Sequence, residues 1–486
     1  DSRILPWQFY ESEYFPFDGQ ILVPFSPEAP LSQVKRQLLP DETLWYSRTI
    51  QLPENCLDTE SQRLLLHFGA VDQICSVYIN GKFVSYHKGG YLPFTTDITD
   101  FITEDLTVSI LISVHDFSDT SYHARGKQQL KRGGMFYTAQ SGIWQTVWME
   151  IVPNEYIRDV RVTPDWDNGL VRMRIRVSSP SLTENASPAH ISHTAADQTD
   201  SQETILAFSP DRQNSSNVIC KVYPPVFLEA DGLNDTLCQD EITAAAIRPG
   251  KGATLSIPEN MQKSWTPKEP WLYPYSLEYG KDRVLGYFAL RKCDVQIADD
   301  GYPRFFLNDQ PYFQSGVLDQ GYWPDGLYTA PSDEAFIYDI RAMKDLGFNM
   351  LRKHGKIEAD RWYFHCDRMG MLVWQDMPNG GSSYHHWFVT YLATLLNWMR
   401  IPVKDLHARL LSRTDEFIDD IRDMVRTLYN HPSIVTWVPF NEGWGQFSTK
   451  KVTDFIHRLD PSRLVDSASG WFDQGCGDIN SLHYYF

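Results

Sequence analysis

The sequence predicts a multidomain protein of mixed β and α/β class, in which two β-sandwiches precede an incomplete (β/α)8 TIM barrel. The first observation is the length: 486 residues, at roughly 150 residues per domain, correspond to about three domains. The second is that short strand-like segments fill residues 1–297 without a helical period. The third is that strands alternate with amphipathic helices from residue 298 onward, as in a parallel sheet with crossover helices.

Residues 1–153 are expected to form a jelly-roll β-sandwich. Short apolar segments such as Leu44–Ile50 are separated by turn signals. Asn80-Gly81 lies between Val77–Ile79 and Phe83-Val84, which is the strongest short-range signal of a β-hairpin. Evenly spaced strands of this kind are typical of a sandwich or a jelly roll.

Residues 154–297 are expected to form an immunoglobulin-like β-sandwich. Apolar residues and arginines alternate with period two from Val171 to Val177, which indicates a strand with one buried face. The middle of this zone, about 179–217, is rich in Ser, Thr, Asn, Asp and Pro and is predicted to be a long loop or insertion. Strand patterns return at Ala253–Ile257 and Tyr275–Tyr279.

Residues 298–486 are expected to form the barrel. Phe336, Ile340 and Met343 mark one helical face, with Ser332 placed to cap the helix and Gly347 to end it. A second amphipathic helix ends before His431-Pro432. Six of the eight barrel strands are predicted, at Phe313–Leu318, Phe348–Leu351, Met371–Trp374, Ile434–Phe440, Leu464–Asp466 and Ile479–Tyr485.

Composition narrows the classes of ligand. Lys and Arg total 44 against 62 Asp and Glu, a formal net charge of −18, so neither nucleic acid nor an anionic membrane surface is an expected partner. Aromatic residues make up 14% of the chain. Rings pack well on β-sheets and also offer platforms for the C–H faces of sugars, and composition alone favours the packing interpretation.

The compartment is predicted from glycosylation signals and cysteines. Asn185, Asn214 and Asn234 are N-x-S/T sequons in or near the polar middle segment, which indicates a secreted, extracellular glycoprotein. Seven cysteines occur without a CxxC pair, so a zinc framework is not expected. Cys220 and Cys238 are close enough in sequence for one disulfide.

Polar residues follow the predicted barrel strands. In a TIM barrel these strand ends meet at the face that carries the active site, and a cluster over successive strand ends therefore indicates a site. The candidate residues are Asp319, Arg352, His354, Asp376, Asn441 and Glu442. Asp319 and Arg352 could instead pair with each other, and Asp376 or His354 could be structural.

Glu442 is the sharpest candidate. Trp437 and Trp444 flank it and are candidate sugar-binding residues that would also partly desolvate its carboxyl group. Burial raises the pKa of a carboxyl group and makes it a usable general acid at neutral pH. The structural alternative is a glutamate that caps the next helix or pairs with an arginine.

Other chemistries lack their motifs. The sequence has no glycine-rich phosphate loop and no serine nucleophile elbow. It shows no constellation of metal ligands, so no cofactor is expected, and Mg²⁺ or Na⁺ has no support from the sequence. The expected partner is an oligosaccharide or glycoside, and assembly into a homo-oligomer stays open.

The motifs together resemble glycoside hydrolase family 2, the β-galactosidase, β-glucuronidase and β-mannosidase group. Val23–Glu28, Gly89–Phe94 and Ser141–Trp148 are similar to its sugar-binding jelly roll. Trp265–Pro267 and Pro270–Tyr273 resemble the end of its immunoglobulin-like domain, and Gly347–Arg352 with Asn441-Glu442 resemble its barrel motifs.

The resemblance implies a retaining exo-glycosidase that cleaves terminal non-reducing β-glycosides. Glu442 would be the acid/base and Asn441 would bind the sugar 2-hydroxyl group. Tyr485 matches a tyrosine that supports the nucleophile, although Tyr484 is adjacent. The nucleophile would be a second glutamate, with its carboxyl group about 5–5.5 Å from the first.

The sequence departs from the family at the nucleophile. That residue belongs to the seventh barrel strand, and none of residues 1–486 matches it, so we expect the natural protein to continue beyond Phe486. The alternative is a non-catalytic carbohydrate-binding relative. A β-galactoside is the first choice of substrate, with β-glucuronide, β-mannoside and β-galactofuranoside open. Lys353 could supply a cation for an acidic sugar.

Overall fold

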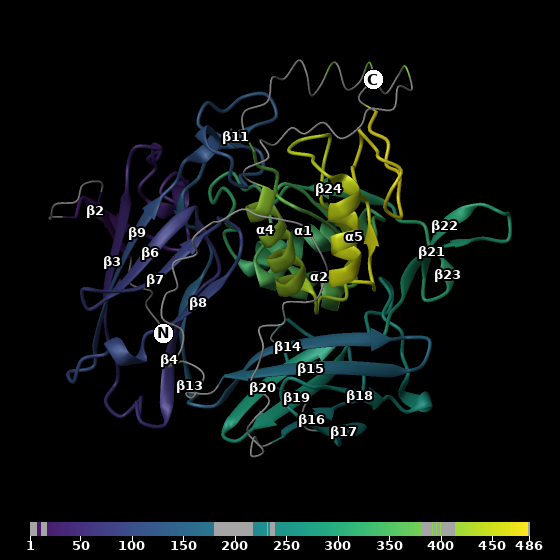
Figure 1. Cartoon of the computed structure of the whole chain (residues 1–486), viewed down its shortest axis with the longest axis horizontal. Coiled ribbons are helices and arrows are strands. Elements are labelled where there is room, and N and C mark those ends of the chain that lie inside the picture. Colours follow the sequence, from purple (N-terminus) through teal and green to yellow (C-terminus); the bar gives the residue numbers. More distant parts are fainter. Residues whose placement is uncertain are drawn as a thin grey trace, which may run out of the picture.

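A computed structural model describes residues 7–10, 17–178, 217–230, 232–233, 239–381, 391, 395, 399 and 414–484. Two β-rich units and one α/β unit follow one another along the chain (Figure 1). This confirms the predicted multidomain β and α/β class. None of the helices among the described residues combines the length and the hydropathy that a membrane span requires.

The first unit is built on two antiparallel sheets. The larger sheet has the order β2-β1-β3-β9-β6-β7, and the smaller has the order β13-β4-β8. The large-sheet strands are β1 (Trp7–Tyr10), β2 (Gly19–Ile21), β3 (Leu44–Gln51), β6 (Ile74–Ile79), β7 (Lys82–Lys88) and β9 (Thr107–His115). The small-sheet strands are β4 (Gln62–Phe68), β8 (Phe94–Asp97) and β13 (Val147–Pro153). Alternate side chains of both sheets, such as Ile110 and Leu64, fill the core between them.

Short pairs and turns complete this unit. β5 (Val71–Asp72) pairs with β12 (Gly142–Ile143), and β10 (Gln128–Gln129) pairs with β11 (Tyr137–Thr138). Among the described residues, 3-10 turns occur at Pro30–Ser32, Thr99–Phe101 and Ser118–Thr120, and in the next unit at Glu259–Met261. The predicted hairpin is confirmed, because β6 and β7 pair across Asn80-Gly81 with positive φ at both residues.

The second unit packs two antiparallel sheets face to face. One has the order β14-β15-β18 and the other β17-β16-β19-β20. Their strands are β14 (Tyr156–Asp165), β15 (Leu170–Ser178), β16 (Val218–Val222), β17 (Thr243–Ile247), β18 (Gly252–Ser256), β19 (Tyr273–Tyr279) and β20 (Asp282–Phe288). The alternation predicted from Val171 to Val177 is confirmed, since Val171, Met173 and Ile175 are fully buried.

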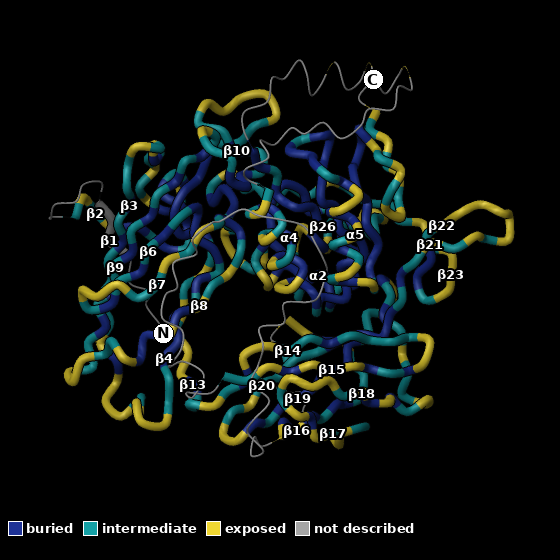
Figure 2. Tube along the Cα trace, viewed as in Figure 1, coloured by how far each residue is buried: buried dark blue, intermediate teal, exposed yellow. Residues whose placement is uncertain are grey.

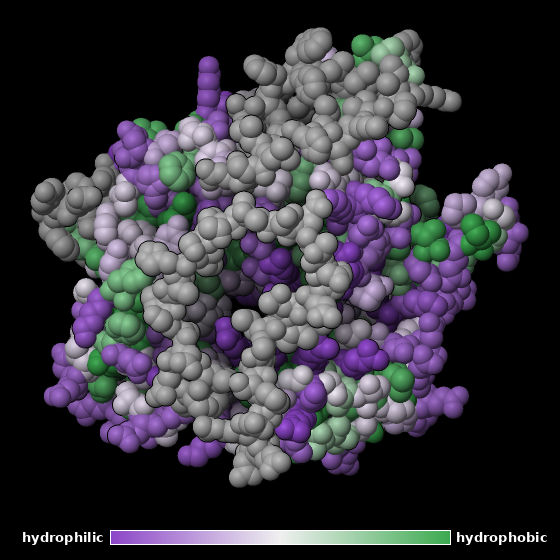
Figure 3. All heavy atoms as spheres, viewed as in Figure 1, coloured by the Kyte–Doolittle hydropathy of each residue, from purple (hydrophilic) through white to green (hydrophobic). Residues whose placement is uncertain are grey.

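A small antiparallel sheet links the second unit to the third. It consists of β21 (Cys293–Ile297), β22 (Pro303–Leu307) and β23 (Gln310–Pro311), so its hydrogen bonds cross the boundary predicted at residue 297. It projects at the right of Figure 1, and the space-filling view shows apolar residues on it (Figure 3). Ile297 and Tyr302 are among its exposed side chains.

The third unit is a parallel five-stranded sheet in sequence order, β24-β25-β26-β27-β28, with helices packed against it. The strands are β24 (Gly316–Asp319), β25 (Met350–Lys353), β26 (Leu372–Asp376), β27 (Ile434–Val438) and β28 (Leu464–Val465). The helices are α1 (Asp333–Asp345), α2 (Asp360–Met369), α4 (Thr414–Leu428) and α5 (Thr449–Leu459). Each strand pairs with the next one in the chain, as in a barrel.

The helices bury the apolar faces that the sequence predicts, but one predicted capping interaction is absent. Phe417 and Ile421 of α4 are buried against the sheet. Gly347 ends α1 with a φ of 90°, a left-handed conformation that glycine adopts without cost. Ser332 does occupy the N-cap position of α1, but its side chain makes no capping hydrogen bond.

The prediction of a sixth barrel strand at Ile479–Tyr485 is wrong for the residues described. Ile479 forms an isolated parallel bridge with Asp466, and residues 480–484 are not in a strand. Side-chain hydrogen bonds replace the backbone ladder in this segment. Ser481 donates to Asp466 at 2.5 Å, and Asp478 accepts a hydrogen bond from the Val465 amide at 2.8 Å. The segment is thus held beside β28 without a continuous ladder.

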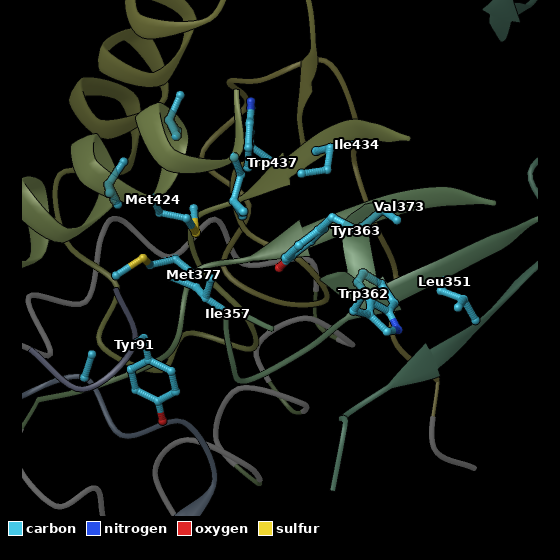
Figure 4. Close-up of a cluster of buried hydrophobic side chains, with 14 of the residues drawn as sticks. Tyr91, Leu351, Ile357, Trp362, Tyr363, Val373, Met377, Met424, Ile434 and Trp437 are labelled. Atoms are coloured by element: carbon cyan, nitrogen blue, oxygen red, sulfur yellow. The ribbon is translucent and has the colours of Figure 1, made fainter. Parts of the chain in front are cut away.

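One apolar core joins the first unit to the barrel. Figure 4 shows Tyr91 of the first unit together with Met377, Trp362 and Trp437 of the third. Figure 2 shows the same region as the buried centre of that part of the molecule. Trp144 of the first unit is also 1% exposed and its indole N–H donates to the Gly90 carbonyl at 2.7 Å. Apolar burial of this extent fixes the first unit against the barrel.

A buried histidine stabilises the other end of the barrel. His431 lies 2.7 Å from Asp367 through Nδ1 and 3.0 Å from Asp360 through Nε2. Tyr287 of the second unit donates to the same Asp367 oxygen at 2.7 Å. Burial disfavours the charged form of His431, but the two carboxylates outweigh it and raise its pKa to about 10.

This network predicts a pH-dependent stability. The folded pKa of His431 lies above the unfolded value near 6.5. The stabilisation of the folded state by the charged imidazole is therefore complete below pH 6.5 and is lost as the pH rises through 10. We expect the free energy of unfolding to fall over this range by at most about 1.4 kcal/mol per pH unit. His431→Gln should remove this slope in denaturant titrations at pH 6.5, 8 and 9.5. His457→Gln, at a more exposed histidine 3.5 Å from Asp478, should keep it. A wild-type-to-His431→Gln difference that is constant with pH would contradict the assignment.

Candidate active site

Ionisable side chains converge where β25, β26 and β27 end. Arg352 is the penultimate residue of β25, His354 follows that strand, and Asp376 ends β26. Asn441 and Glu442 come three and four residues after β27. Because the strands are parallel, these positions lie at one edge of the sheet.

Arg352 ties three of these strand ends together. Its Nε and Nη2 donate to the two carboxylate oxygens of Asp376 at 3.0 and 2.8 Å. Nη2 also donates to the Asn441 side-chain carbonyl at 2.8 Å. A bidentate pair of this kind has a fixed geometry, so Arg352 sets the relative positions of Asp376 and Asn441.

His354 is the second partner of Asp376, through a 2.5 Å contact from Nδ1. Burial by itself would raise the pKa of Asp376, but the Arg352 guanidinium and the His354 hydrogen bond hold it below its usual value. Burial lowers the pKa of His354. The neutral imidazole therefore donates from Nδ1 and keeps Nε2 as an acceptor, and Nε2 makes no hydrogen bond to the part of the chain that the structure describes.

Glu442 is held in an unusual backbone conformation. Its φ is 53°, a left-handed value that costs a non-glycine residue about 1 kcal/mol or more. The Glu442 amide donates to the Ser469 carbonyl at 2.8 Å, and Gly443 follows with a φ of 77°. A Cβ atom on Gly443 would lie 2.4 Å from the Phe472 ring. Glu442 is 8% exposed, so the strained turn presents a nearly buried carboxyl group.

His483 connects Glu442 to the arginine network. Its Nδ1 lies 2.9 Å from a Glu442 carboxyl oxygen. Its Nε2 lies 3.1 Å from the Ser469 hydroxyl and 3.5 Å from Nη1 of Arg352. Since arginine can only donate, Nε2 is the acceptor and Nδ1–H donates to Glu442 in the neutral ring. His483 was not among the predicted site residues, although it lies at the end of the predicted strand Ile479–Tyr485.

Asp466 is a further carboxyl group near this network. It is fully buried at the bridge to Ile479. Burial raises its pKa, the Ser481 hydrogen bond and the positive charge of Arg352 lower it, and the net pKa is about 6.

Three other residues fall on the opposite face of the strands. The register aligns Asp319 with Lys353, Lys353 with Gln375, and Gln375 with Trp437, and side chains of a strand alternate between its two faces. Asp319 therefore bonds Lys353 at 3.0 Å and does not join the cluster. Lys353 also bonds Glu358 at 3.2 Å, so it cannot serve an acidic sugar as predicted.

Trp437 requires the same correction. It is fully buried, and its indole N–H donates to Asp460 at 3.0 Å on the helix-facing side. It is a core residue and cannot contact a substrate. Trp444 is partly exposed, and its ring lies 6.1 Å from that of Phe136 in the first unit. Tyr485 and the sequon residues Asn185, Asn214 and Asn234 lie outside the described residues, as does Cys238.

Among the described residues no three His, Cys, Asp or Glu side chains are grouped so that they could hold a metal ion.

A parallel sheet whose strands pair in chain order, with a buried carboxyl group beyond one strand end, is the arrangement expected of a TIM barrel. The family model described as "Glycosyl hydrolases family 2, sugar binding domain" matches residues 31–153. The model described as "Glycosyl hydrolases family 2, TIM barrel domain" matches residues 305–486. The chain belongs to glycosyl hydrolase family 2, which confirms the resemblance inferred from the sequence.

Individual relatives are distant. The chain is 24% identical over 426 residues to a β-galactosidase of Thermoanaerobacter pseudethanolicus, covering 86% of this chain and 47% of that protein. It is 23% identical over 475 residues to the β-glucuronidase of Homo sapiens, covering 91% and 62%. The chain thus spans about half the length of the curated relatives it matches.

Solved structures show the same fold. A β-D-glucuronidase of Dictyoglomus thermophilum aligns with a TM-score of 0.68 at 18% identity, covering 95% of this chain and 70% of that one. A structure described as a putative β-galactosidase of Bacteroides fragilis aligns with a TM-score of 0.66 at 18% identity, covering 99% and 66%.

Proposed function

We propose that the strand-end cluster is the active site of a retaining exo-β-glycosidase that hydrolyses O-glycosyl bonds of terminal β-glycosides. The observation that carries the proposal is the geometry around Glu442. Its carboxyl group is nearly buried in a strained turn, follows Asn441 directly, and accepts a hydrogen bond from His483. Strain of this kind persists where the surrounding structure holds a functional residue in place.

Each residue has a role in the first step. Glu442, in its acid form, donates its proton to the glycosidic oxygen while the bond from that oxygen to the sugar C1 breaks. A second carboxylate forms a bond to C1 and holds the sugar. Asn441 binds the sugar 2-hydroxyl group, and the Arg352 contact at 2.8 Å orients its amide so that the NH₂ group faces away from Arg352.

In the second step Glu442 acts as a base. Its carboxylate takes a proton from water, the resulting hydroxide attacks C1, and the bond to the second carboxylate breaks. His483 is a positioning residue for Glu442, and Asp376 positions Arg352 and His354. We assign the second carboxylate to none of the residues that the structure describes.

The β-units and the compartment belong to the same proposal. We infer that the first unit is a jelly roll and the second an immunoglobulin-like sandwich, which the two packed antiparallel sheets of each unit support. Secretion rests on the three sequons alone.

The glycone is the open part of the proposal. A β-galactoside is the first candidate and a β-glucuronide the second, supported by relatives with both names. The test is a panel of 4-nitrophenyl β-galactopyranoside, β-glucuronide, β-mannoside and β-galactofuranoside with the full-length protein that contains residues 1–486. We expect hydrolysis of at least one member and none of the α-anomers. Sugar binding without hydrolysis of any member would favour the non-catalytic carbohydrate-binding alternative.

A further inference from the structure

A segment of the first unit reaches across to the barrel strand ends. Ala124 forms an antiparallel bridge with Gly380. The amides of Arg125 and Gly126 both donate to the Asn379 carbonyl, at 2.8 and 2.9 Å. Residues 124–126 are therefore anchored just beyond Asp376, on the loop that follows β26.

The contact brings Lys127 next to the residues that follow β25. A Cβ atom on Gly126 would lie 2.0 Å from the Gly355 carbonyl oxygen, and one on Gly355 would lie 3.9 Å from the Lys127 amide nitrogen. Only glycine at residue 126, where φ is 58°, permits this approach without strain. Lys127 thus lies beside Gly355, the residue after His354.

The backbone of Lys127 is fixed on its other side too. Its carbonyl accepts a hydrogen bond from the Tyr137 amide at 2.9 Å. The next side chain, Gln128, is buried and donates to Asp72 and Tyr91 at 3.2 Å each. The origin of the Lys127 side chain is therefore well defined.

The charged groups that shift the pKa of Lys127 all belong to the candidate active site. Burial lowers the pKa of its ammonium group, and the carboxylates of Glu442 and Asp376 oppose this effect. Arg352 contributes repulsion. Within the part of the chain that the structure describes, this half-buried ammonium group makes no hydrogen bond and no ion pair.

The neighbouring cations differ from Lys127 in this respect. Arg352 is bound to Asp376, and Lys353 and Lys356 are bound to Glu358 at 3.2 and 2.8 Å. A half-buried cation without a partner is unfavourable until an acceptor arrives. A ligand beside Glu442 would supply that acceptor.

We propose that Lys127 is a substrate-binding residue, supplied by the first unit, whose ammonium group donates a hydrogen bond to an oxygen of the glycone. The inference rests on the proposed function and deepens it. A sugar hydroxyl and a uronate carboxylate both offer the required oxygen. The carboxylate gains more, because its hydrogen bond to an ammonium group is charge-assisted on both sides.

The test compares Lys127→Met with Lys131→Met, a matched control at an exposed lysine of the same segment. The full-length protein is assayed on a β-galactoside and a β-glucuronide. For Lys127→Met we expect KM to rise about 10-fold on a neutral glycoside and about 100-fold on a uronide, with kcat within about threefold. The control should match wild type, and Lys127→Arg should recover part of the loss.

Three results would overturn the inference. The first is an unchanged KM in a Lys127→Met variant that circular dichroism shows to be folded. The second is a fall in kcat alone with a shifted pH profile, which would show that Lys127 acts through Glu442. If the wild type hydrolyses no glycoside, the proposed function fails by itself. Calorimetric titration with free galactose and glucuronate then tests Lys127 separately, and equal affinities of wild type and Lys127→Met for both sugars would overturn its role.

Discussion

Glu442→Gln in the full-length protein is expected to lower kcat about 10³- to 10⁴-fold for a glycoside with a poor alkyl leaving group. The amide keeps the shape of the carboxyl group and its contact with His483, but it has no proton to give to the glycosidic oxygen. An activated 2,4-dinitrophenyl glycoside needs no protonation, so its first step should be nearly unaffected and should produce a burst of dinitrophenol. Steady-state release should then be slow, because water lacks its base.

Added azide completes this prediction. Azide attacks C1 without a general base and should restore turnover of the activated substrate in Glu442→Gln, giving a β-glycosyl azide. Glu269→Gln, at an exposed glutamate of the second unit, serves as the matched control and should behave as wild type. Equal losses on both substrates with no response to azide would assign Glu442 a structural role.

The second large effect is expected at Arg352. Asp376 is 1% exposed and bonded to Arg352 in a bidentate pair. Arg352→Met leaves that carboxylate buried beside an uncharged side chain, which costs about 3–5 kcal/mol of unfolding free energy. It also releases the Asn441 amide, so kcat/KM should fall at least about 100-fold. Arg352→Lys keeps the positive charge but loses the bidentate geometry. Its stability and its kcat/KM should lie between those of wild type and Arg352→Met.

A double variant separates the two effects. Arg352→Met with Asp376→Asn removes both charges, so most of the lost stability should return while activity stays low. Arg176→Met breaks an exposed pair with Asp159 and should cost at most about 1 kcal/mol. Recovery of activity along with stability in the double variant would show that the pair is purely structural.

The site residues that lie at strand ends could be predicted from the sequence. Arg352, His354, Asp376, Asn441 and Glu442 follow apolar strands of a parallel sheet, and the edge at which they meet is fixed by topology. The motif Asn441-Glu442 also carried the family resemblance. These residues needed no knowledge of the packing.

The pairings could not be predicted, because they depend on register. Asp319 was predicted to bind substrate, with a pair to Arg352 as the alternative, but the two side chains leave opposite faces of β24 and β25. Trp437 also lies on the helix-facing side of the sheet. It was predicted to bind substrate because the sequence does not show which face of the strand it occupies. A shift of one residue exchanges the two faces, and a short predicted strand such as Phe313–Leu318 does not by itself fix which residue faces the helices.

Lys127 could not have been found from the sequence. It is about 230 residues from His354 and belongs to a different unit, and no motif surrounds it. Its position results from close packing of Gly126 on Gly355 and from two hydrogen bonds to Asn379. Such contacts between units become visible only once the apolar core shared by the first unit and the barrel is assembled.

In the proposed mechanism Glu442 serves a double displacement at C1. Proton NMR of the first sugar released from a β-glycoside that the full-length protein cleaves tests this mechanism. The β-anomer should appear first, and the α-anomer should grow in only through mutarotation. Initial release of the α-anomer would show a single displacement and would contradict the retaining mechanism.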